Sequence, residues 1–349
     1  MKTTSTLPPS FGELYSHDPD VPHATAPVQH LCSLPIRMRE VFSGIIPTAQ
    51  PFVYDDSKLQ HRRIFCFFDS QGETVLVYEA IGGDRRDSRN FSYFLSKDTS
   101  RFLIADFYKA GRNGTLKGVY LDWDYPGDAC GSPNDTENLI AFVADLVSLN
   151  LSVILAVPPK LALISRYSLP RVMPLVEYVV VKTHTLRLSS AVYCSGARQY
   201  AARIFNGVRN LLLPQVHHKL AYSISVAPDT FTARDAVMGA VSLGPSMWEH
   251  YTKKPDKTHY AAICFMNVTR FPEHPECALV SQGSDTYFKV AAFAGPEELQ
   301  TRMRRAYDDG MGDVPVVVYD VDLDDFKGYC PAGVMSPLIR ALAITTYNT

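Results

Sequence analysis

Two carboxylates one residue apart end the stretch Lys117-Gly118-Val119-Tyr120-Leu121-Asp122-Trp123-Asp124-Tyr125-Pro126-Gly127. The stretch is a short run of β-forming residues, which Tyr-Pro-Gly then terminates. Successive side chains of a strand point to opposite faces, so Tyr120, Asp122 and Asp124 share one face of the predicted strand. Burying two acids at the end of a strand costs free energy unless a site uses them. The stretch therefore predicts a functional site at a strand end.

The composition is that of an ordinary globular protein. The 349 residues are 46% hydrophobic and 20% charged, with a net charge of −2. This length allows one large domain or two modest ones. The near-neutral charge favours neither a nucleic-acid nor an anionic-membrane partner. The longest apolar run, residues 151–165, is broken by Pro158-Pro159, so we expect no membrane span.

Strand-like and helix-like segments alternate along the chain from residue 63. This pattern predicts parallel strands joined by crossover helices, and six or seven such units fit a TIM (β/α)8-type barrel, an α/β fold, better than an open sheet. The predicted strands are 64–68, 74–81, 118–122, 151–157, 177–182, 221–226 and 314–321, and the predicted helices are 102–108, 134–147, 160–167, 200–213, 297–306 and 336–344.

Three regions of the chain differ in amino-acid composition and in hydrophobic pattern. Residues 1–60 are rich in Pro, Ser, Thr and His and predict a weakly structured N-terminal extension. Residues 61–349 carry the barrel pattern. Within them, residues 237–293 contain Tyr-, Cys- and Val-rich runs without long helices, which indicates an inserted α+β subdomain.

Four segments together resemble landmarks of glycoside hydrolase family 18, the chitinases and chitinase-like proteins. The run 118–127 is similar to the family's fourth-strand pattern D-G-x-D-x-D-W-E-Y-P. Ile81-Gly82-Gly83 resembles the family's S-I-G-G, residues 260–264 resemble Y-x-E-I-C, and residues 318–326 resemble W-A-L-D-L-D-D-F. The resemblance covers residues 63–345, and no single motif is intact.

The resemblance implies a degenerate catalytic strand. The family uses a strand-4 Glu as acid while the acetamide of the substrate attacks the anomeric carbon. The acid position falls on Asp124 and its acetamide-orienting partner on Asp122, while two earlier Asp positions are Lys117 and Tyr120. Asp is one methylene shorter than Glu, and misplacing a catalytic group by about 1 Å can cost roughly 10²-fold in rate.

The expected sugar contacts are altered as well. Where the family has Met-x-Tyr-Asp on the sixth strand, Lys182, His184 and Thr185 stand for Met, Tyr and Asp. Tyr319 replaces the Trp under the sugar and can still stack on it. The resemblance therefore assigns substrate binding to Tyr125, His184 and Tyr319, and it implies no cofactor and no metal.

For each of these residues a purely structural role is the alternative to a role in the site. Asp122 and Asp124 could hydrogen-bond backbone at the barrel mouth, and His184 could be a satisfied core histidine. Asp324-Asp325 predicts a structural turn, and Cys264 and Cys277 are close enough in sequence to predict a local disulfide.

The first strands leave two topologies open. Only five residues separate Phe68 from Thr74, where the family has a complete β/α unit. Either residues 51–54 form the first strand and 64–68 the second, or one β/α unit is missing, which would expose a barrel edge. The second alternative is favoured, as a true deletion or as a fault of the gene model.

Sequons and cysteines favour a secretory origin. Five of the nine asparagines lie in N-x-Ser/Thr sequons, where chance gives about one; they are Asn90, Asn113, Asn134, Asn150 and Asn267. Seven cysteines without a C-x-x-C pair fit a few disulfides and a leftover thiol, not a zinc site. The first residues show no apolar signal segment, so the alternative is a cytosolic protein with chance sequons.

Three functions follow. The leading prediction is a secreted glycoprotein that is inactive or crippled as a chitinase and binds chitin or other N-acetylglucosamine-containing glycans. The second is a weak chitinase with Asp124 as acid. The third is a secreted interaction protein that binds no carbohydrate. The sequence indicates no oligomeric state.

Overall fold

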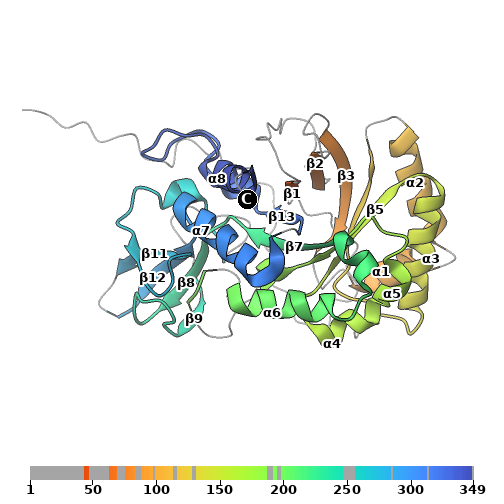
Figure 1. Cartoon of the computed structure of the whole chain (residues 1–349), viewed down its shortest axis with the longest axis horizontal. Coiled ribbons are helices and arrows are strands. Elements are labelled where there is room, and N and C mark those ends of the chain that lie inside the picture. Colours follow the sequence, from red (N-terminus) through yellow and green to blue (C-terminus); the bar gives the residue numbers. More distant parts are fainter. Residues whose placement is uncertain are drawn as a thin grey trace, which may run out of the picture. The chain divides into compact units, whose positions relative to one another are not determined.

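Eight strands close a barrel in the order β1-β13-β7-β6-β5-β4-β3-β2 (Figure 1). The computed structural model describes residues 43–46, 63–68, 75–83, 88–96, 99–112, 116–127, 131–186, 192–194, 198–246, 256–283, 286–312 and 314–347. The barrel strands are β1 Ser43–Ile46, β2 Arg63–Phe68, β3 Val75–Gly82, β4 Gly118–Asp122, β5 Ser152–Val157, β6 Tyr178–Val181, β7 Leu220–Ser225 and β13 Val316–Tyr319. The run from β3 through β7 to β13 is parallel, which confirms the predicted TIM-type barrel.

The barrel departs from uniform β/α repetition at its first strands. β1 runs parallel to β2 and antiparallel to β13, and β2 runs antiparallel to β3. Only residues 69–74 connect β2 with β3, fewer than a crossover helix needs, so a hairpin stands where a β/α unit is expected. Because β1 fills the gap, the eight-stranded barrel is closed and leaves no edge there. Residues 51–54 lie outside the described part, and β1 precedes residue 60; the domain boundaries stay a prediction.

Helices cover the outside of the parallel strands. They are α1 Ser88–Phe94, α2 Ser100–Arg112, α3 Asp135–Ser148, α4 Leu161–Ile164, α5 Leu169–Val172, α6 Arg198–Arg209, α7 Pro296–Ala306 and α8 Pro337–Tyr347. In β4 the alternation predicted from sequence is present: Leu121 and Trp123 pack with Phe142 of α3 in the core between strands and helices. Tyr120 packs inside the barrel with Tyr319. The face of Asp122 and Asp124 is therefore the inner one.

A second, antiparallel sheet is inserted after β7, as predicted. Its order is β10-β11-β12-β8-β9, with β8 Asp229–Ala233, β9 Ser242–Pro245, β10 Thr269–Arg270, β11 Ala278–Gly283 and β12 Phe288–Phe293. A buried ion pair holds its first strand: Lys257 Nζ lies 2.6 Å from Asp229 Oδ1 and also donates to Ser225 Oγ of β7 at 3.3 Å. The inserted sheet is thereby attached to the barrel.

The predicted local disulfide is wrong. Cys264 bonds to Cys330, beyond β13, and Cys277 bonds to Cys194. Cys264 lies in the turn after the 3-10 helix Tyr260–Ala262, whereas Cys277 immediately precedes β11. The strand β10 lies between the two cysteines in sequence and pairs with β11. Each cysteine is bonded to a partner distant in sequence. No helix within the described ranges is both long and apolar enough to cross a bilayer.

Candidate active site

Trp123 anchors the end of β4. Its ring is fully buried and stacks on Phe91 of α1, with 5.4 Å between ring centroids. Its Nε1 donates a hydrogen bond to Ser88 Oγ at 2.9 Å, and its carbonyl oxygen accepts one from the hydroxyl of Tyr167. Because Trp123 is fixed on the outer side of the barrel, its neighbours Asp122 and Asp124 are directed to the inner side.

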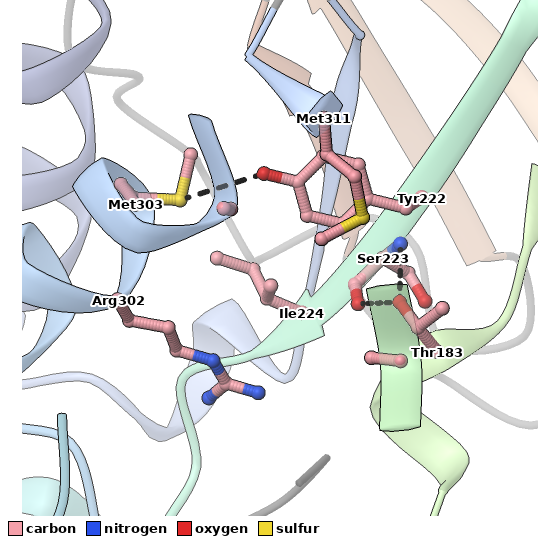
Figure 2. A pocket seen from close by; sticks show the side chains of 9 residues that line it. Thr183, Tyr222, Ser223, Ile224, Arg302, Met303 and Met311 are labelled. Atoms are coloured by element: carbon pink, nitrogen blue, oxygen red, sulfur yellow. Dashed lines mark hydrogen bonds between the residues drawn. The ribbon is translucent and has the colours of Figure 1, made fainter. Parts of the chain in front are cut away.

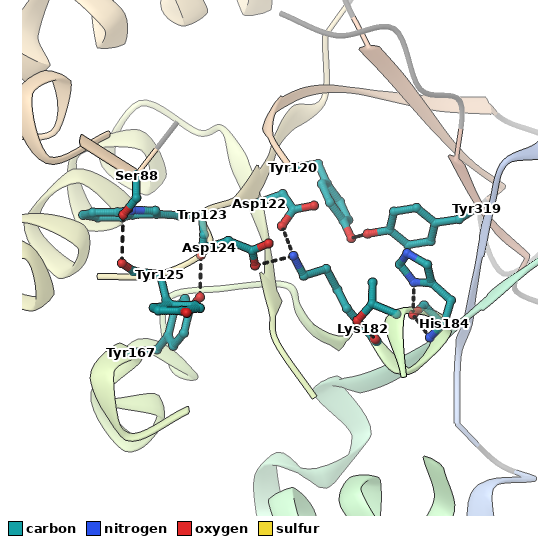
Figure 3. Close-up of polar contacts among 12 residues, drawn as sticks. Ser88, Tyr120, Asp122, Trp123, Asp124, Tyr125, Tyr167, Lys182, His184 and Tyr319 are labelled. Atoms are coloured by element: carbon teal, nitrogen blue, oxygen red, sulfur yellow. Dashed lines mark hydrogen bonds and ion pairs between the residues drawn. The ribbon is translucent and has the colours of Figure 1, made fainter. Parts of the chain in front are cut away.

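A lysine ammonium group occupies the space between the two predicted catalytic carboxylates. Lys182 Nζ lies 2.7 Å from Asp122 Oδ1 and 2.5 Å from Asp124 Oδ1 (Figure 3). The exposed fractions of the side chains are 5% for Lys182, 7% for Asp122 and 23% for Asp124. The cluster of these three residues, here called the lysine–aspartate cluster, is nearly closed to solvent and carries a formal charge of −1.

The carboxylates determine the ionisation of Lys182. Burial lowers the pKa of its ammonium group, but the charges of Asp122 and Asp124 and the hydrogen bonds to both outweigh burial, so the pKa lies above its ordinary value. Lys182 is therefore charged at neutral pH. The charged ammonium group is therefore held between the carboxyl groups of Asp122 and Asp124.

The aromatic residues expected to contact sugar contact each other. The His184 ring stacks on Tyr319 with 3.8 Å between centroids, and His184 Nδ1 is 2.7 Å from Ser223 Oγ. The hydroxyls of Tyr319 and Tyr120 are hydrogen-bonded across the barrel interior. One face of Tyr319 is thus covered by this chain's own histidine (Figure 3).

Tyr125, the third expected sugar contact, lies apart from that pair. Its ring faces the guanidinium group of Arg166 at 5.4 Å from the centroid, and its carbonyl oxygen accepts a hydrogen bond from Ser88. In Figure 3 it lies on the side of Trp123 and Tyr167, away from His184. The structure therefore brings Asp122 and Asp124 together, and His184 with Tyr319, but places Tyr125 in neither group.

Lys182 is the site residue that motif reasoning missed. Comparison with the sixth-strand motif of the family shows only that Lys182 stands where the family has Met. A positional signal was nevertheless present, because Lys182 directly follows the buried strand β6, and the C-terminal ends of parallel barrel strands converge on one end of the barrel. Lys117, in contrast, is exposed before β4 and has no part in the cluster.

The Asp324-Asp325 pair lies at the start of the last helix. Asp324 accepts hydrogen bonds from the backbone N–H groups of Leu338 and Ile339 in the first turn of α8. Asp325 accepts one from the N–H of Cys330 at 2.7 Å. Burial raises the pKa of Asp324 to about 6, against the hydrogen bonds from the backbone. These contacts are those of a structural turn.

A small cavity lies outside the barrel wall, beside β7 (Figure 2). Its lining is mostly apolar apart from Arg302 and the hydroxyl groups of Thr183, Tyr222 and Ser223. None of the five predicted site residues lines it; the lining residues are Thr183, Ala201, Tyr222, Ser223, Ile224, Arg302, Met303, Ala306 and Met311. Within the described ranges, no group of three or more acidic, His or Cys side chains is arranged to hold a metal.

Solved structures with the same fold are chitinases and chitinase-like proteins. Catalytic domain 2 of the Group II chitinase of Ostrinia furnacalis is 16% identical with a TM-score of 0.62 and covers 78% of each chain. The immunomodulatory chitinase TsES1 of Trichuris suis is 15% identical with a TM-score of 0.62, over 77% of this chain and 80% of its own. Human YKL-39, described as a pseudo-chitinase with retained chitooligosaccharide binding, is 15% identical with a TM-score of 0.61, over 76% and 79%.

At these identities the structures establish the fold alone, and a search of curated proteins yields no match. The family is established by sequence, because residues 34–278 match the family model "Glycosyl hydrolases family 18". This match covers β4, the lysine–aspartate cluster and the strands β8, β9 and β10 of the inserted sheet. The chain belongs to glycosyl hydrolase family 18 and has a chitinase-like fold.

Proposed function

We propose that this protein is a non-hydrolytic member of its family that binds chitooligosaccharides or related N-acetylglucosamine-containing glycans. The observation that carries the proposal is the contact of one ammonium group, Lys182 Nζ, with both Asp122 and Asp124. A glycosidase needs these positions for proton transfer and for holding the reacting group. Here both are engaged by the chain itself.

Two effects oppose hydrolysis, and they act on the same group. A general acid has to be free to donate its proton to the leaving oxygen, whereas Asp124 Oδ1 is held 2.5 Å from Lys182 Nζ. Asp124 is also one methylene shorter than the Glu expected there, and an error of about 1 Å can cost roughly 10²-fold in rate. Asp124 thus combines engagement by Lys182 with short reach.

Glycan binding is supported by position and by analogy. The residues of the cluster and of the Tyr319–His184 pair lie at the C-terminal ends of barrel strands or directly after them. Ligands of this fold bind at that end of the barrel. Asp124 keeps 23% exposure there. The similar protein human YKL-39 is described as a pseudo-chitinase that retains chitooligosaccharide binding, which shows that this fold can separate binding from hydrolysis.

A second candidate function is an interaction protein that binds no carbohydrate. It is favoured by the stacking of His184 on Tyr319, because the ring expected to support a sugar already has an aromatic partner. In this case the barrel would serve as a scaffold only.

Isothermal calorimetry with chitotetraose tests the proposal. We expect binding heat for the wild type, with the ligand recovered intact by mass spectrometry. Tyr319→Ala should weaken binding at least tenfold, whereas Tyr287→Ala, an exposed tyrosine beside the second sheet, should bind like the wild type. Absence of heat for the wild type would favour the non-carbohydrate function, and ligand cleavage abolished by Asp124→Asn would identify a weak chitinase.

We further propose that the protein is secreted. Among the described residues, two disulfides join cysteines 83 and 66 positions apart, and such bonds persist in oxidising compartments. Detection of the oxidised protein in culture medium, and not in the cytosol, is the expected result. A reduced, cytosolic protein would contradict it.

A further inference from the structure

Three of the sequon asparagines are exposed in the described part of the chain. Asn134, Asn150 and Asn267 lie at turns or element ends and have exposed side chains. Asn134 is the N-cap residue of α3 but makes no side-chain capping hydrogen bond. Asn150 follows the end of α3 with a φ of 61°, in a turn at the surface. Their amide groups are thus available for a bulky modification without loss of core packing.

Two of these asparagines bracket a single helix. α3 has 14 residues, Asp135–Ser148, so its ends are about 21 Å apart. Asn134 precedes its first residue and Asn150 is two positions beyond its last. Two further sequons fall on the neighbouring helices in sequence, since Asn90 is within α1 and Asn113 directly follows α2.

The three helices form one side of the barrel. α2 packs against α3, and α1 is joined to α3 because Ser92 Oγ donates a hydrogen bond to Asp135 Oδ1 at 2.6 Å. In Figure 1, α2 and α3 lie side by side over the strands that they cover. Asn134 and Asn150, at the two ends of α3, therefore belong to this side, here called the α1–α3 side.

The same side exposes large aromatic rings. Tyr93 of α1 and Phe102 of α2 are each 63% exposed, and Tyr108 of α2 is 39% exposed. Large apolar side chains that a protein surface leaves exposed can serve as a contact surface or raise the risk of aggregation. A covalent glycan is bulky and hydrophilic, and pyranose rings can pack on aromatic faces.

We infer that the α1–α3 side carries N-linked glycans, at Asn134 and Asn150, which cover this aromatic surface. The inference rests on the proposed secretion. It is independent of chitooligosaccharide binding, because the carboxylates of the site belong to the inner face of the barrel.

The test uses the full-length protein secreted from eukaryotic cells, treated or not with peptide-N-glycosidase F, and read by intact mass and peptide mapping. We expect deamidation at residues 134 and 150 after treatment. Asn134→Gln and Asn150→Gln should each remove one mass step, and the double variant two. Asn210→Gln, an exposed asparagine outside any sequon, should leave the mass pattern unchanged.

A second readout addresses the covering of the surface. Deglycosylated wild type should bind more 8-anilinonaphthalene-1-sulfonate than the glycosylated form, and Tyr93→Ser/Phe102→Ser should remove most of that increase. A secreted protein with residues 134 and 150 unmodified would overturn the inference, and so would dye binding that glycan removal leaves unchanged. Calorimetry with chitotetraose on the same samples would show whether the proposed function fails separately.

Discussion

At the scale of single residues, Lys182 changes how the two acids at the end of β4 are interpreted. Its ammonium group binds the two carboxylates that define the site, so the acids are partners of a structural cation. Removal of one partner of a buried ion pair leaves uncompensated charge, which costs about 3–5 kcal/mol. The cluster should therefore contribute to stability as well as oppose catalysis.

Lys182→Met should lower the free energy of unfolding by about 3 kcal/mol, at the lower end of that range because Asp124 is partly exposed. The pKa of Lys182 is raised above 10.5, so its contribution is fully present below that pH and is lost only as the pH rises through the higher folded value. The penalty should thus be constant through the neutral range. Urea unfolding measures it.

The matched control is Lys117→Met, because Lys117 is exposed at the start of the same strand; its effect should stay within about 0.5 kcal/mol. Adding Asp122→Asn to Lys182→Met should recover part of the loss, since it removes one of the two unpaired carboxylates. Equal stability of Lys182→Met and the wild type would contradict the structural role of the cluster.

Restoring the longer acid should not by itself restore catalysis. In Asp124→Glu the ammonium group of Lys182 remains available to bind the new carboxylate, so we expect no turnover of a chromogenic chitooligosaccharide. Asp124→Glu combined with Lys182→Met removes both obstacles and should give detectable turnover. Turnover in the single variant Asp124→Glu would show that Lys182 does not oppose proton donation.

Alternation along one strand was enough to predict which residues of β4 share a face, which the structure places inside the barrel. Tyr120, Asp122 and Asp124 lie on it, as the strand periodicity requires. The partner Lys182 comes from a different strand end, 60 residues away from Asp122, and no local pattern specifies which side chains meet across a barrel. The predicted roles of Asp122 and Asp124 therefore remain predictions, although their proximity is established.

At the scale of elements, the start of α8 contains a buried acid. Asp324 accepts hydrogen bonds from N–H groups in the first turn of the helix, and burial raises its pKa from 3.8 to about 6. The folded state thus binds a proton more tightly than the unfolded state. Its contribution to stability is fully present below pH 3.8 and is lost as the pH rises through 6.

Asp324→Asn should remove this pH dependence. Between pH 4 and 7 the wild type should lose about 2 kcal/mol through Asp324, a component that the variant lacks. Urea unfolding of both proteins across this range gives the difference curve, with Asp145→Asn on the exposed side of α3 as the control. A difference curve that is flat, or that rises with pH, would contradict the raised pKa.

The elements of the parallel run and the strand β2 could be predicted, whereas β1 and the pairing of the first strands could not. Buried strands such as β5 and β6 are continuous apolar runs, which local sequence indicates well. The position of β1 depends on pairing with β2 and with β13, almost 300 residues later. Such pairing depends on barrel closure, which local periodicity does not encode.

At the scale of the whole molecule, two disulfides fix distant parts of the chain. Cys264–Cys330 joins the inserted region to the segment after β13, and Cys194–Cys277 joins the segment before α6 to the second sheet. Sequence proximity favoured Cys264–Cys277, which is wrong because sheet formation separates the two residues. The pairing is a property of the tertiary fold.

Non-reducing peptide mapping should recover the pairs Cys264–Cys330 and Cys194–Cys277. Cys264→Ser/Cys330→Ser should lower stability by about 4 kcal/mol at most, the chain-entropy value for closing a loop of this length. Differential scanning calorimetry measures the loss. A linked Cys264–Cys277 peptide would contradict the arrangement of the inserted sheet.

The central claim is that the lysine–aspartate cluster has replaced catalysis in a chitinase-like barrel. Hydrolysis of a chromogenic chitooligosaccharide by the purified wild type tests it most directly, with Asp124→Asn measured in parallel. We predict that the wild type releases no more chromophore than Asp124→Asn or a protein-free sample. Release by the wild type that Asp124→Asn abolishes would contradict the claim, because Asp124 would then donate protons despite Lys182.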